Sequence, residues 1–286
     1  MSSPIGVVTV SYGSRAVLGP FLESLPDSSL RPLVVVVADN LPNQDDGTVE
    51  MVHRAGGIYL PIESNPGYGA AMNAAVRLLP PDVEWVLISN PDVVLEEGSL
   101  DVLLQTASTD PAIGTVGPAI TTDGVTYPSA RAIPSLRTGV GHALFANLWV
   151  GNPWSRAYRN EATVAGSRSD VGWLSGACLL VRRSAFTQLG GFDPNYFMYF
   201  EDVDLGYRMG LSGYRNVYEP GGRARHDGAH STGGDSVAMI RAHHSSARRF
   251  LDQKYGATIL GPVRLALRVG LSIRSKTLER RARKDR

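Results

Sequence analysis

The chain alternates short, continuous apolar runs with longer segments in which apolar residues recur at helical spacing. Short runs rich in β-branched residues are typical of strands buried on both faces, as in a parallel sheet. Such runs span residues 5–12, 33–38, 57–62, 85–89 and 113–117. Helices are predicted between them, at residues 20–25, 70–79 and 100–107. This alternation predicts an α/β fold with a mostly parallel central sheet flanked by helices.

The run at residues 85–89 ends abruptly in Asn90-Pro91-Asp92. Proline cannot donate a backbone hydrogen bond and disfavours helix in the residue before it, so the strand stops at Asn90. Asp92 is left at the carboxyl end of a central strand, the edge at which open α/β sheets bind ligands. A carboxylate there is a candidate Mg²⁺ ligand, but aspartate also caps strand-to-helix turns. The residues alone leave both interpretations open.

Two further strand ends predict a nucleotide site. Asp39 follows the second strand, where its carboxylate can accept the N–H of a pyrimidine ring. Asn65-Pro66-Gly67-Tyr68-Gly69 leads from the third strand into a helix. Glycines let backbone amides approach a diphosphate, and a helix N-terminus favours negative charge, although an ordinary tight turn uses glycine as well. The spacing matches neither a dinucleotide-binding fingerprint nor a P-loop.

Residues 192–208 combine an aromatic cluster with several carboxylates. Buried charge is costly unless it is paired, and Asp204 and Arg208 have the spacing of a helical ion pair. Glu201 and Asp202 come at the predicted helix start, where the helix dipole favours anions. They either cap the helix or act as a general base beside an apolar wall that raises a pKa.

Residues 120–169 show little periodicity, which is typical of functional loops, and we expect them to form a substrate-facing lobe. A broken apolar run at residues 173–181 predicts a strand interrupted by Gly176. Cys178, the single cysteine, lies in that run and is expected to be buried. One cysteine excludes an internal disulfide and favours a reducing compartment. No stretch has the length and apolarity of a signal peptide or a spanning helix, so neither is expected.

Charge is distributed unevenly along the 286 residues, which carry 28 basic and 27 acidic side chains and a net charge of +1. Residues 262–286 hold nine of the basic and two of the acidic side chains, a net charge of +7, so residues 1–261 carry −6. A basic tail of this kind suggests binding to an anionic surface, either membrane or nucleic acid.

Apolar residues occupy most of a helical wheel in this tail: Val263, Leu265, Ala266, Leu267, Val269, Leu271, Ile273 and Leu278. The pattern predicts a helix that lies on a membrane surface, with packing against the domain as the other interpretation. Nucleic acid is disfavoured as a partner, because no aromatic residue interleaves the arginines.

Several motifs resemble, in order and spacing, the family 2 inverting glycosyltransferases of GT-A fold, a Rossmann-like α/β fold. These motifs lie at residues 8–12, 38–40, 65–73, 90–92, 173–177, 190–193, 201–204, 226 and 231. Within this family the chain is most similar to the actinobacterial enzymes that transfer L-rhamnose from dTDP-L-rhamnose to polyprenyl-diphospho-N-acetylglucosamine. The closer match is carried by residues 127–131, 152–154, 172–176 and 229–233.

The resemblance implies roles for individual residues. It implies that Asp202 is the general base and that Asp92 and His226 hold Mg²⁺ or Mn²⁺. The nucleotide sugar would contact Ser11, Asp39, Asn65, Gly67, Asn90 and Asp92. The acceptor side would comprise Trp173, Ser175, Gly176 and Glu201. Asn90 departs from the family's Asp-x-Asp motif, which predicts a weaker metal site.

The resemblance also implies an organisation: a GT-A domain at residues 1–261 and a basic amphipathic tail at 262–286. Residues 1–119 would form the nucleotide-sugar half of the domain and residues 120–261 its acceptor and catalytic half. We expect a cytoplasmic enzyme of cell-wall (arabinogalactan linker) synthesis, peripheral on the inner face of the plasma membrane. A transferase of the same fold using galactofuranose or N-acetylglucosamine is one alternative, and a non-catalytic nucleotide-binding membrane scaffold is another. Nothing in the sequence predicts the oligomeric state.

Overall fold

The computed structural model describes residues 3–42, 46–134, 166–226 and 236–256, and residues 261, 265, 268–270, 272 and 276. Within these residues the main strands are β1 (Ile5–Ser11), β2 (Leu33–Asp39), β3 (Ile58–Pro61), β4 (Trp85–Ser89), β5 (Val93–Leu95), β6 (Ile113–Thr122), β11 (Cys178–Arg182) and β12 (Arg215–His226). They form a sheet in the order β3-β2-β1-β4-β11-β6-β12-β5, and β7 (Val125–Tyr127) and β9 (Ser169–Val171) pair with β6 and β12. A separate two-stranded sheet joins β8 (Ala130–Arg131) to β10 (Trp173–Leu174).

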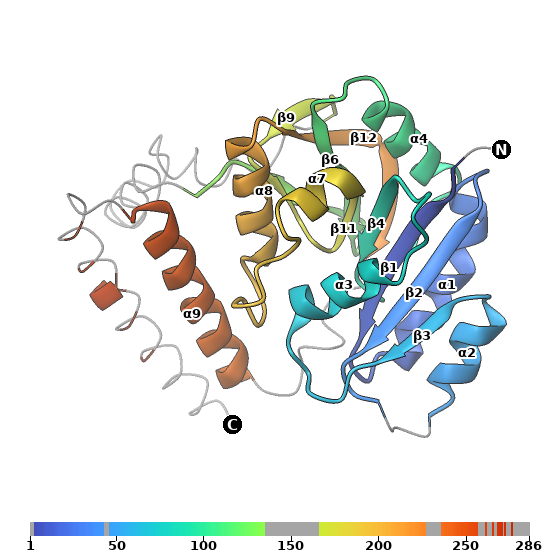
Figure 1. Cartoon of the computed structure of the whole chain (residues 1–286), viewed down its shortest axis with the longest axis horizontal. Coiled ribbons are helices and arrows are strands. Elements are labelled where there is room, and N and C mark those ends of the chain that lie inside the picture. The colour runs from blue at the N-terminus through green and yellow to red at the C-terminus, as the bar shows by residue number, and fades with distance from the viewer. Residues whose placement is uncertain are drawn as a thin grey trace.

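Helices cover both faces of the main sheet, as Figure 1 shows. They are α1 (Arg15–Ser28), α2 (Thr48–Arg54), α3 (Tyr68–Arg77), α4 (Ser99–Ala107), α7 (Arg183–Gln188), α8 (Glu201–Leu211) and α9 (Ser236–Lys254). Side chains alternate across the strands: Val7 and Leu87 pack with α1, α2 and α4, whereas Val8 and Ile88 pack with α3, α7 and α8. The strands read as continuous apolar runs because both faces are buried. The predicted α/β fold is confirmed.

The strands β3, β2, β1 and β4 are parallel to one another, and β6 and β12 form a second parallel pair. Beyond β4 the sheet becomes mixed, since β11 runs antiparallel to both β4 and β6. The apolar run at residues 173–181 therefore forms two strands in different sheets, not one interrupted strand. The turn at residues 175–177 separates them, and Cys178 is buried as predicted.

Asn90-Pro91-Asp92 ends β4 as predicted, but it leads into the short strand β5 and not into a helix. β5 runs antiparallel to the end of β12, and this pairing places His226 opposite Val93. β12 is long because it continues through an irregularity between Glu219 and Arg223, and its far end therefore reaches β5.

The expectation of an irregular lobe at residues 120–169 is wrong for its first part, where β6 ends and β7 and β8 follow. Residues 135–165, which include Asn152-Pro153-Trp154, lie outside the described residues, as do residues 229–233. The predicted ion pair between Asp204 and Arg208 is confirmed, at 2.7 Å within α8. The division of the chain into two halves and a tail stays a prediction.

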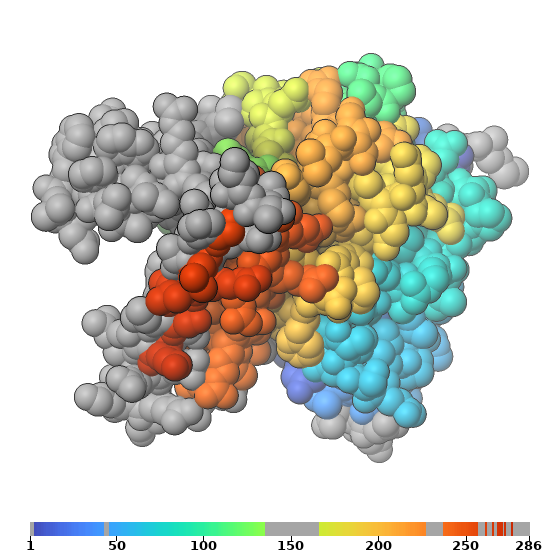
Figure 2. All heavy atoms as spheres, turned by 60° about the vertical axis from the view of Figure 1, so that its left-hand side comes forward, coloured from blue at the N-terminus to red at the C-terminus, as the bar shows by residue number. Residues whose placement is uncertain are grey.

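The helix α9 lies beside the segment that leads into α8, far from β1, β2 and β3 (Figure 1). The space-filling view shows the same neighbours, with α9 in orange to red against the yellow segment that precedes α8 (Figure 2). None of the helices that the structure describes combines the length and apolarity needed to cross a membrane.

Candidate active site

The carboxylate of Asp39 is fixed at the carboxyl end of β2. It is 5% exposed; Oδ2 accepts a hydrogen bond from the Tyr59 hydroxyl at 2.8 Å and Oδ1 accepts one from the Leu41 N–H at 3.0 Å. Burial and the neighbouring Asp39 raise the pKa of Tyr59, which keeps its hydroxyl protonated as a donor. Each Asp39 oxygen retains a lone pair, so the carboxylate can still accept an N–H from a ligand.

The next candidate residues gather beside Asp39. Ser11 ends β1 opposite Asp39, and its carbonyl oxygen accepts the Asn40 N–H at 2.9 Å. The Asn40 Nδ2 donates to Asn65 Oδ1 at 3.1 Å and to the Gly67 carbonyl oxygen at 3.4 Å. The ends of β1, β2 and the loop after β3 therefore form one hydrogen-bonded edge, the place at which open α/β sheets bind ligands.

Gly67 joins this edge to the segment that precedes α8. Its φ of +94° lies in the left-handed region, and a Cβ there would collide with the Phe197 carbonyl oxygen. The same oxygen accepts the N–H of Tyr68, the first residue of α3, at 3.0 Å. Only glycine permits this approach, so the edge formed by β1, β2 and the loop after β3 is connected to the segment before α8 through one carbonyl group.

Asp92, Asn90 and His226 come together although β12 is far from β4 in the sequence. The His226 Nε2 lies 3.0 Å from Asp92 Oδ1 and 3.4 Å from Asn90 Nδ2. Tyr127 packs its ring edge-on against the imidazole, with ring centres 5.9 Å apart. The pairing of β5 with β12 produces this meeting, since it brings His226 to the residue after Asp92.

The spacing of the Asp92 and His226 side chains fits a bound divalent cation. Asp92 is 8% exposed, yet its Oδ1 is buried without a hydrogen-bond donor even though an imidazole nitrogen lies 3.0 Å away. Two atoms that bind one octahedral Mg²⁺ at about 2.1 Å and at right angles lie about 3.0 Å apart. In the described residues no group of three His, Cys, Asp or Glu side chains meets, so Asp92 and His226 would share the ion with a substrate or water.

Asp202 lies in the first turn of α8, and backbone donors hold both of its carboxylate oxygens. Its Oδ2 accepts the Gly176 N–H at 3.0 Å and its Oδ1 accepts the Val203 N–H at 2.8 Å. Burial raises the pKa of Asp202, while these hydrogen bonds and the positive charge of Arg131 oppose the rise. Hydrogen bonds from N–H groups favour the ionised form, so Asp202 is the carboxylate of the pair that keeps its negative charge.

Glu201 has the opposite environment. It is 7% exposed, and its Oε2 is buried without a hydrogen-bond partner. Burial and the adjacent Asp202 raise the pKa of Glu201 to about 8. Glu201 packs beside Gly69, where a Cβ would stand 3.6 Å from the Glu201 Cβ, so it lies toward α3. The two neighbouring carboxyl groups thus share one charge near neutral pH, and Asp202 carries it.

Of the remaining predicted residues, Ser175 and Gly176 lie in the turn between β10 and β11, and Trp173 lies in β10. The Ser175 N–H donates to the Ser129 carbonyl oxygen at 2.7 Å, and the Gly176 carbonyl oxygen accepts the Tyr68 hydroxyl at 2.7 Å. Trp173 is half-buried and donates its indole N–H to a backbone carbonyl oxygen at 3.1 Å. Gly176 therefore connects α3 to Asp202, because its carbonyl oxygen binds Tyr68 and its N–H binds Asp202.

Two tyrosines that support the site were not among the predicted site residues. Tyr59 lies in an apolar strand and Tyr68 opens a helix, and in both places a core aromatic residue looks the same in the sequence. Burial and nearby carboxylates raise the pKa of Tyr68 well above its usual value, so its hydroxyl remains a donor. The only sequence signal that marks Tyr68 as part of the site is its position between Gly67 and Gly69.

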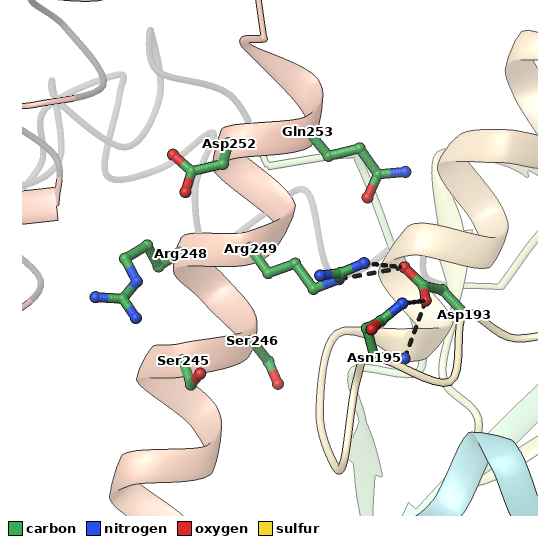
Figure 3. Close-up of a pocket in the computed structure, with 8 residues that line it drawn as sticks. All are labelled: Asp193, Asn195, Ser245, Ser246, Arg248, Arg249, Asp252 and Gln253. Atoms are coloured by element: carbon green, nitrogen blue, oxygen red, sulfur yellow. Dashed lines mark hydrogen bonds and ion pairs between the residues drawn. The ribbon is translucent and has the colours of Figure 1, made fainter.

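A polar pocket of about 480 Å³ lies between α9 and the loop before α8 (Figure 3). Arg249 points across it and binds Asp193 at 2.9 and 3.2 Å, whereas Arg248 points away. Ser246 donates to the Met198 carbonyl oxygen at 2.8 Å. This pocket is separate from the site at Asp202 and is better described as the interface through which α9 supports the loop.

Comparison with known families decides the class of protein. Residues 3–244 match the family model described as glycosyltransferase like family 2. The chain belongs to this family. The predicted resemblance is therefore confirmed, and the protein is a glycosyltransferase.

Two relatives place this glycosyltransferase more finely. It is 44% identical to the N-acetylglucosaminyl-diphospho-decaprenol L-rhamnosyltransferase of Mycobacterium tuberculosis (strain H37Rv), over 98% of this chain and 94% of the relative. It is 26% identical to rhamnosyltransferase WbbL of Escherichia coli K12, over 87% of this chain and 92% of the relative.

Solved structures support the fold of this glycosyltransferase. A Pyrobaculum calidifontis mannosyltransferase in complex with GDP-Man and Mn²⁺ has a TM-score of 0.59 at 16% identity, covering 92% of this chain and 68% of that one. GalNAc-T7 with UDP, GalNAc and Mn²⁺ has a TM-score of 0.62 at 14% identity, covering 87% of this chain and 47% of that one. At this identity the likeness concerns the fold, and the GT-A-like architecture is confirmed.

Proposed function

We propose that the chain transfers L-rhamnose from dTDP-L-rhamnose to a polyprenyl-diphospho-N-acetylglucosamine, with inversion at the anomeric carbon. The observation that carries this proposal is the 44% identity, over nearly the whole chain, to the mycobacterial L-rhamnosyltransferase. The arabinogalactan linker of the cell wall would be the destination of the product. The geometry around Asp202 supports a reaction that needs one ionised base.

Asp202 acts as the general base in this proposal. An acceptor hydroxyl gives its proton to the Asp202 carboxylate as its oxygen attacks the anomeric carbon of rhamnose. The bond from that carbon to the diphosphate breaks, and its electron pair leaves with dTDP. The N–H groups of Gly176 and Val203 hold the carboxylate in place before the proton arrives. General-base assistance of this kind typically contributes about 10²- to 10⁴-fold in rate.

The nucleotide is expected at the edge formed by Ser11, Asp39, Asn65 and Gly67. Asp39 would accept the N–H of the thymine ring, since its carboxylate is held rigidly by Tyr59. Asp92 and His226 would hold Mg²⁺ or Mn²⁺ beside the diphosphate, with Asn90 as a neutral neighbour. A bound divalent cation supplies positive charge that stabilises the departing nucleoside diphosphate.

The acceptor carries a long apolar lipid, so the enzyme has to work at a membrane surface. We place it on the cytoplasmic face of the plasma membrane, attached peripherally through the basic tail. Leu265 is 64% exposed and Val269 is 51% exposed, one helical turn apart, which supports an apolar stripe open to lipid. Arg268 binds Asp252 of α9 at 2.8 Å, so one face of this segment is also tied to the domain.

A panel of radiolabelled nucleotide sugars, offered with a short-chain polyprenyl-diphospho-N-acetylglucosamine, tests the proposal. Transfer from dTDP-L-rhamnose is expected to exceed transfer from UDP-galactofuranose and UDP-N-acetylglucosamine by at least about tenfold, the discrimination that a few pocket contacts supply. A preference for a UDP-sugar would show that the donor is not dTDP-L-rhamnose, although the protein would still be a glycosyltransferase. Nucleotide binding without transfer from any donor would favour the non-catalytic scaffold.

A further inference from the structure

Arg131 is a half-buried arginine whose guanidinium is only partly used by the protein. The pairing of β8 with β10 places it opposite Trp173, and its guanidinium carbon lies 5.6 Å from the centre of the indole ring. Its Nε–H donates to the Pro128 carbonyl oxygen at 2.9 Å. Its terminal nitrogens have no hydrogen-bond or ion-pair partner in the described part of the chain. The Trp173 ring and the Pro128 carbonyl group therefore fix the orientation of the Arg131 guanidinium, and its terminal nitrogens can still donate to a ligand.

The stack of Arg131 on Trp173 lies one helical turn from Asp202. Trp173 packs so closely on Gly206 that a Cβ there would collide with it. Asp202 and Gly206 are four residues apart in α8 and therefore share a face. Asn216 secures this contact, because its Nδ2 donates to backbone carbonyl oxygens on both sides of it, at 2.9 and 3.0 Å.

The stack is on the side of Asp202 that faces away from the nucleotide edge. Trp173 and Tyr207 of α8 both pack against the cluster that contains Phe250 of α9, and α8 stands between α9 and the strands β1, β2 and β3 in Figure 1. The other side of Asp202 is bound by the Gly176 turn, which Tyr68 joins to α3. The guanidinium therefore lies on the α9 side of Asp202, where its positive charge acts on that carboxylate.

We propose that Arg131, backed by Trp173, binds the diphosphate group of the lipid-linked acceptor, an inference that rests on the proposed function. A planar guanidinium suits phosphate oxygens because it donates two parallel hydrogen bonds to them. The acceptor carries its diphosphate and its reacting hydroxyl on the same sugar. Holding the diphosphate at Arg131 would thus direct the hydroxyl toward Asp202, while the donor diphosphate is expected at Asp92 and His226.

Two acceptors distinguish binding of the diphosphate from an effect of Arg131 that does not involve it. One is a short-chain lipid diphospho-N-acetylglucosamine, and the other is an alkyl N-acetylglucosaminide without phosphate. With the first acceptor, Arg131→Gln is expected to raise KM about 10- to 100-fold, the loss of a charge-assisted hydrogen bond, whereas any change in kcat through the charge of Arg131 on Asp202 should be the same for both acceptors. With the second acceptor, and for the donor, KM should stay within about twofold, since neither uses the guanidinium. Arg131→Lys should be intermediate, because it keeps the charge and loses the planar fork.

Arg54→Gln is the matched control. Arg54 is an exposed arginine of α2 whose Nε–H also donates to a backbone carbonyl oxygen, at 3.3 Å. It is expected to leave all KM values unchanged. Thermal melting of each variant shows whether it folds, and Arg131→Lys keeps the comparison possible if Arg131→Gln does not.

An equal rise in KM for both acceptors would overturn the inference, because Arg131 would then act on the fold or on the part that the two acceptors share. A raised donor KM would overturn it too, by placing the guanidinium at the donor diphosphate. Titration calorimetry with the diphosphate acceptor tests the inference by binding alone. Weaker binding to Arg131→Gln than to the wild type supports the inference, and equal binding contradicts it. Absence of rhamnosyl transfer by the wild type would instead remove the proposed function.

Discussion

At the scale of single residues, the adjacent carboxyl groups of Glu201 and Asp202 differ in what surrounds them. Asp202 receives two backbone N–H groups, while the buried Oε2 of Glu201 receives none. The pair therefore divides one proton and one charge near neutral pH, and the charge rests on the residue that faces the Gly176 turn. A carboxyl group kept neutral beside a charged one is a common arrangement in acid–base sites.

Glu201→Gln should make the protein more stable at high pH. Between the ordinary carboxyl pKa of 4.5 and the raised value of about 8, the folded protein holds a proton that the unfolded chain has released. The free energy of unfolding therefore falls as pH rises through this window, by about 1.4 kcal/mol for each pKa unit. Glutamine removes this penalty, so the melting temperature of the variant minus that of the wild type should grow from about pH 5 to about pH 9.

Glu23→Gln, at an exposed position of α1, is the control and should show a difference that does not depend on pH. If the Glu201→Gln difference is just as independent of pH, Glu201 is ionised in the folded protein and the division of charge described above is wrong.

Asp92→Ala and His226→Ala should weaken dTDP binding in Mg²⁺ by at least about tenfold and leave binding in EDTA unchanged, because both act through the ion. Asp123→Ala, in an exposed turn, is the control and should have no effect in either buffer. Titration calorimetry measures all three. A wild-type affinity for dTDP that is the same with and without metal would remove the ion from the site.

Contacts between distant residues were predicted from the sequence only where the family resemblance named both partners. The resemblance predicted Asp92 and His226 as partners, and the structure brings them to 3.0 Å. The hydrogen bonds of Tyr59 and Tyr68 were not foreseen, because a tyrosine in an apolar strand or at a helix start has no sequence mark that separates support of a site from core packing. For the same reason, the sequence marks Arg131 only as part of a family motif.

At the scale of elements, the segment that leads into α8 is strained and supported from outside. Tyr199 and Phe200 have φ values of 66° and 67°, a left-handed conformation that costs non-glycine residues about 1–3 kcal/mol each. The ring of His243 in α9 packs edge-on against both, with ring centres 5.5 and 5.4 Å apart. The helix α9 therefore holds the backbone that aims Glu201 and Asp202.

Arg249→Ala should loosen this segment. Arg249 binds Asp193 through two nitrogens and lies 5.5 Å from the centre of the Tyr196 ring. Because the pair is partly exposed, we expect a loss of only about 1 kcal/mol in stability, together with a fall in transfer rate of up to about tenfold from misplacement of Asp202.

Arg248→Ala is the matched control, since Arg248 is the next residue of α9 and points away from Asp193 (Figure 3). Hydrogen exchange in residues 193–200 should rise for Arg249→Ala and not for Arg248→Ala. Equal exchange in the two variants would show that α9 does not support the segment.

The elements that the sequence predicted best are those buried on both faces, such as β1, β2 and β4, because a short, continuous run of β-branched residues is typical of a buried strand. The position of β11 between β4 and β6 was not predictable in this way. It depends on pairing between Cys178 and Ser89, which are far apart in the chain and carry no local signal. The short strands β5 and β8 were missed because two or three residues are too few to show a period.

At the scale of the whole molecule, positive charge and exposed apolar side chains occur together in the C-terminal segment. Residues 262–286 carry a net charge of +7. Leu265 and Val269 add exposed apolar side chains to this segment. Basic residues near an anionic leaflet contribute about 1 kcal/mol each, so the segment can hold the enzyme at the membrane without a spanning helix.

The double substitution Leu265→Glu and Val269→Glu should reduce flotation with phosphatidylglycerol liposomes, and cutting the chain after Gly261 should abolish it. Leu30→Glu is the control, because Leu30 is 98% exposed and lies outside the tail. A truncated protein that floats as well as the full chain would show that the tail is not the anchor and would make residues 120–169 the better candidate.

The rate of rhamnosyl transfer by Asp202→Asn, compared with the wild type, tests the role of Asp202 as general base most directly. Asparagine keeps the shape of the side chain but cannot take the acceptor proton, so a folded variant that still binds dTDP should lose about 10²- to 10³-fold in turnover. A wild type that transfers rhamnose while Asp202→Asn works at nearly the same rate would contradict this role, and the base would have to be sought elsewhere, first at Glu201.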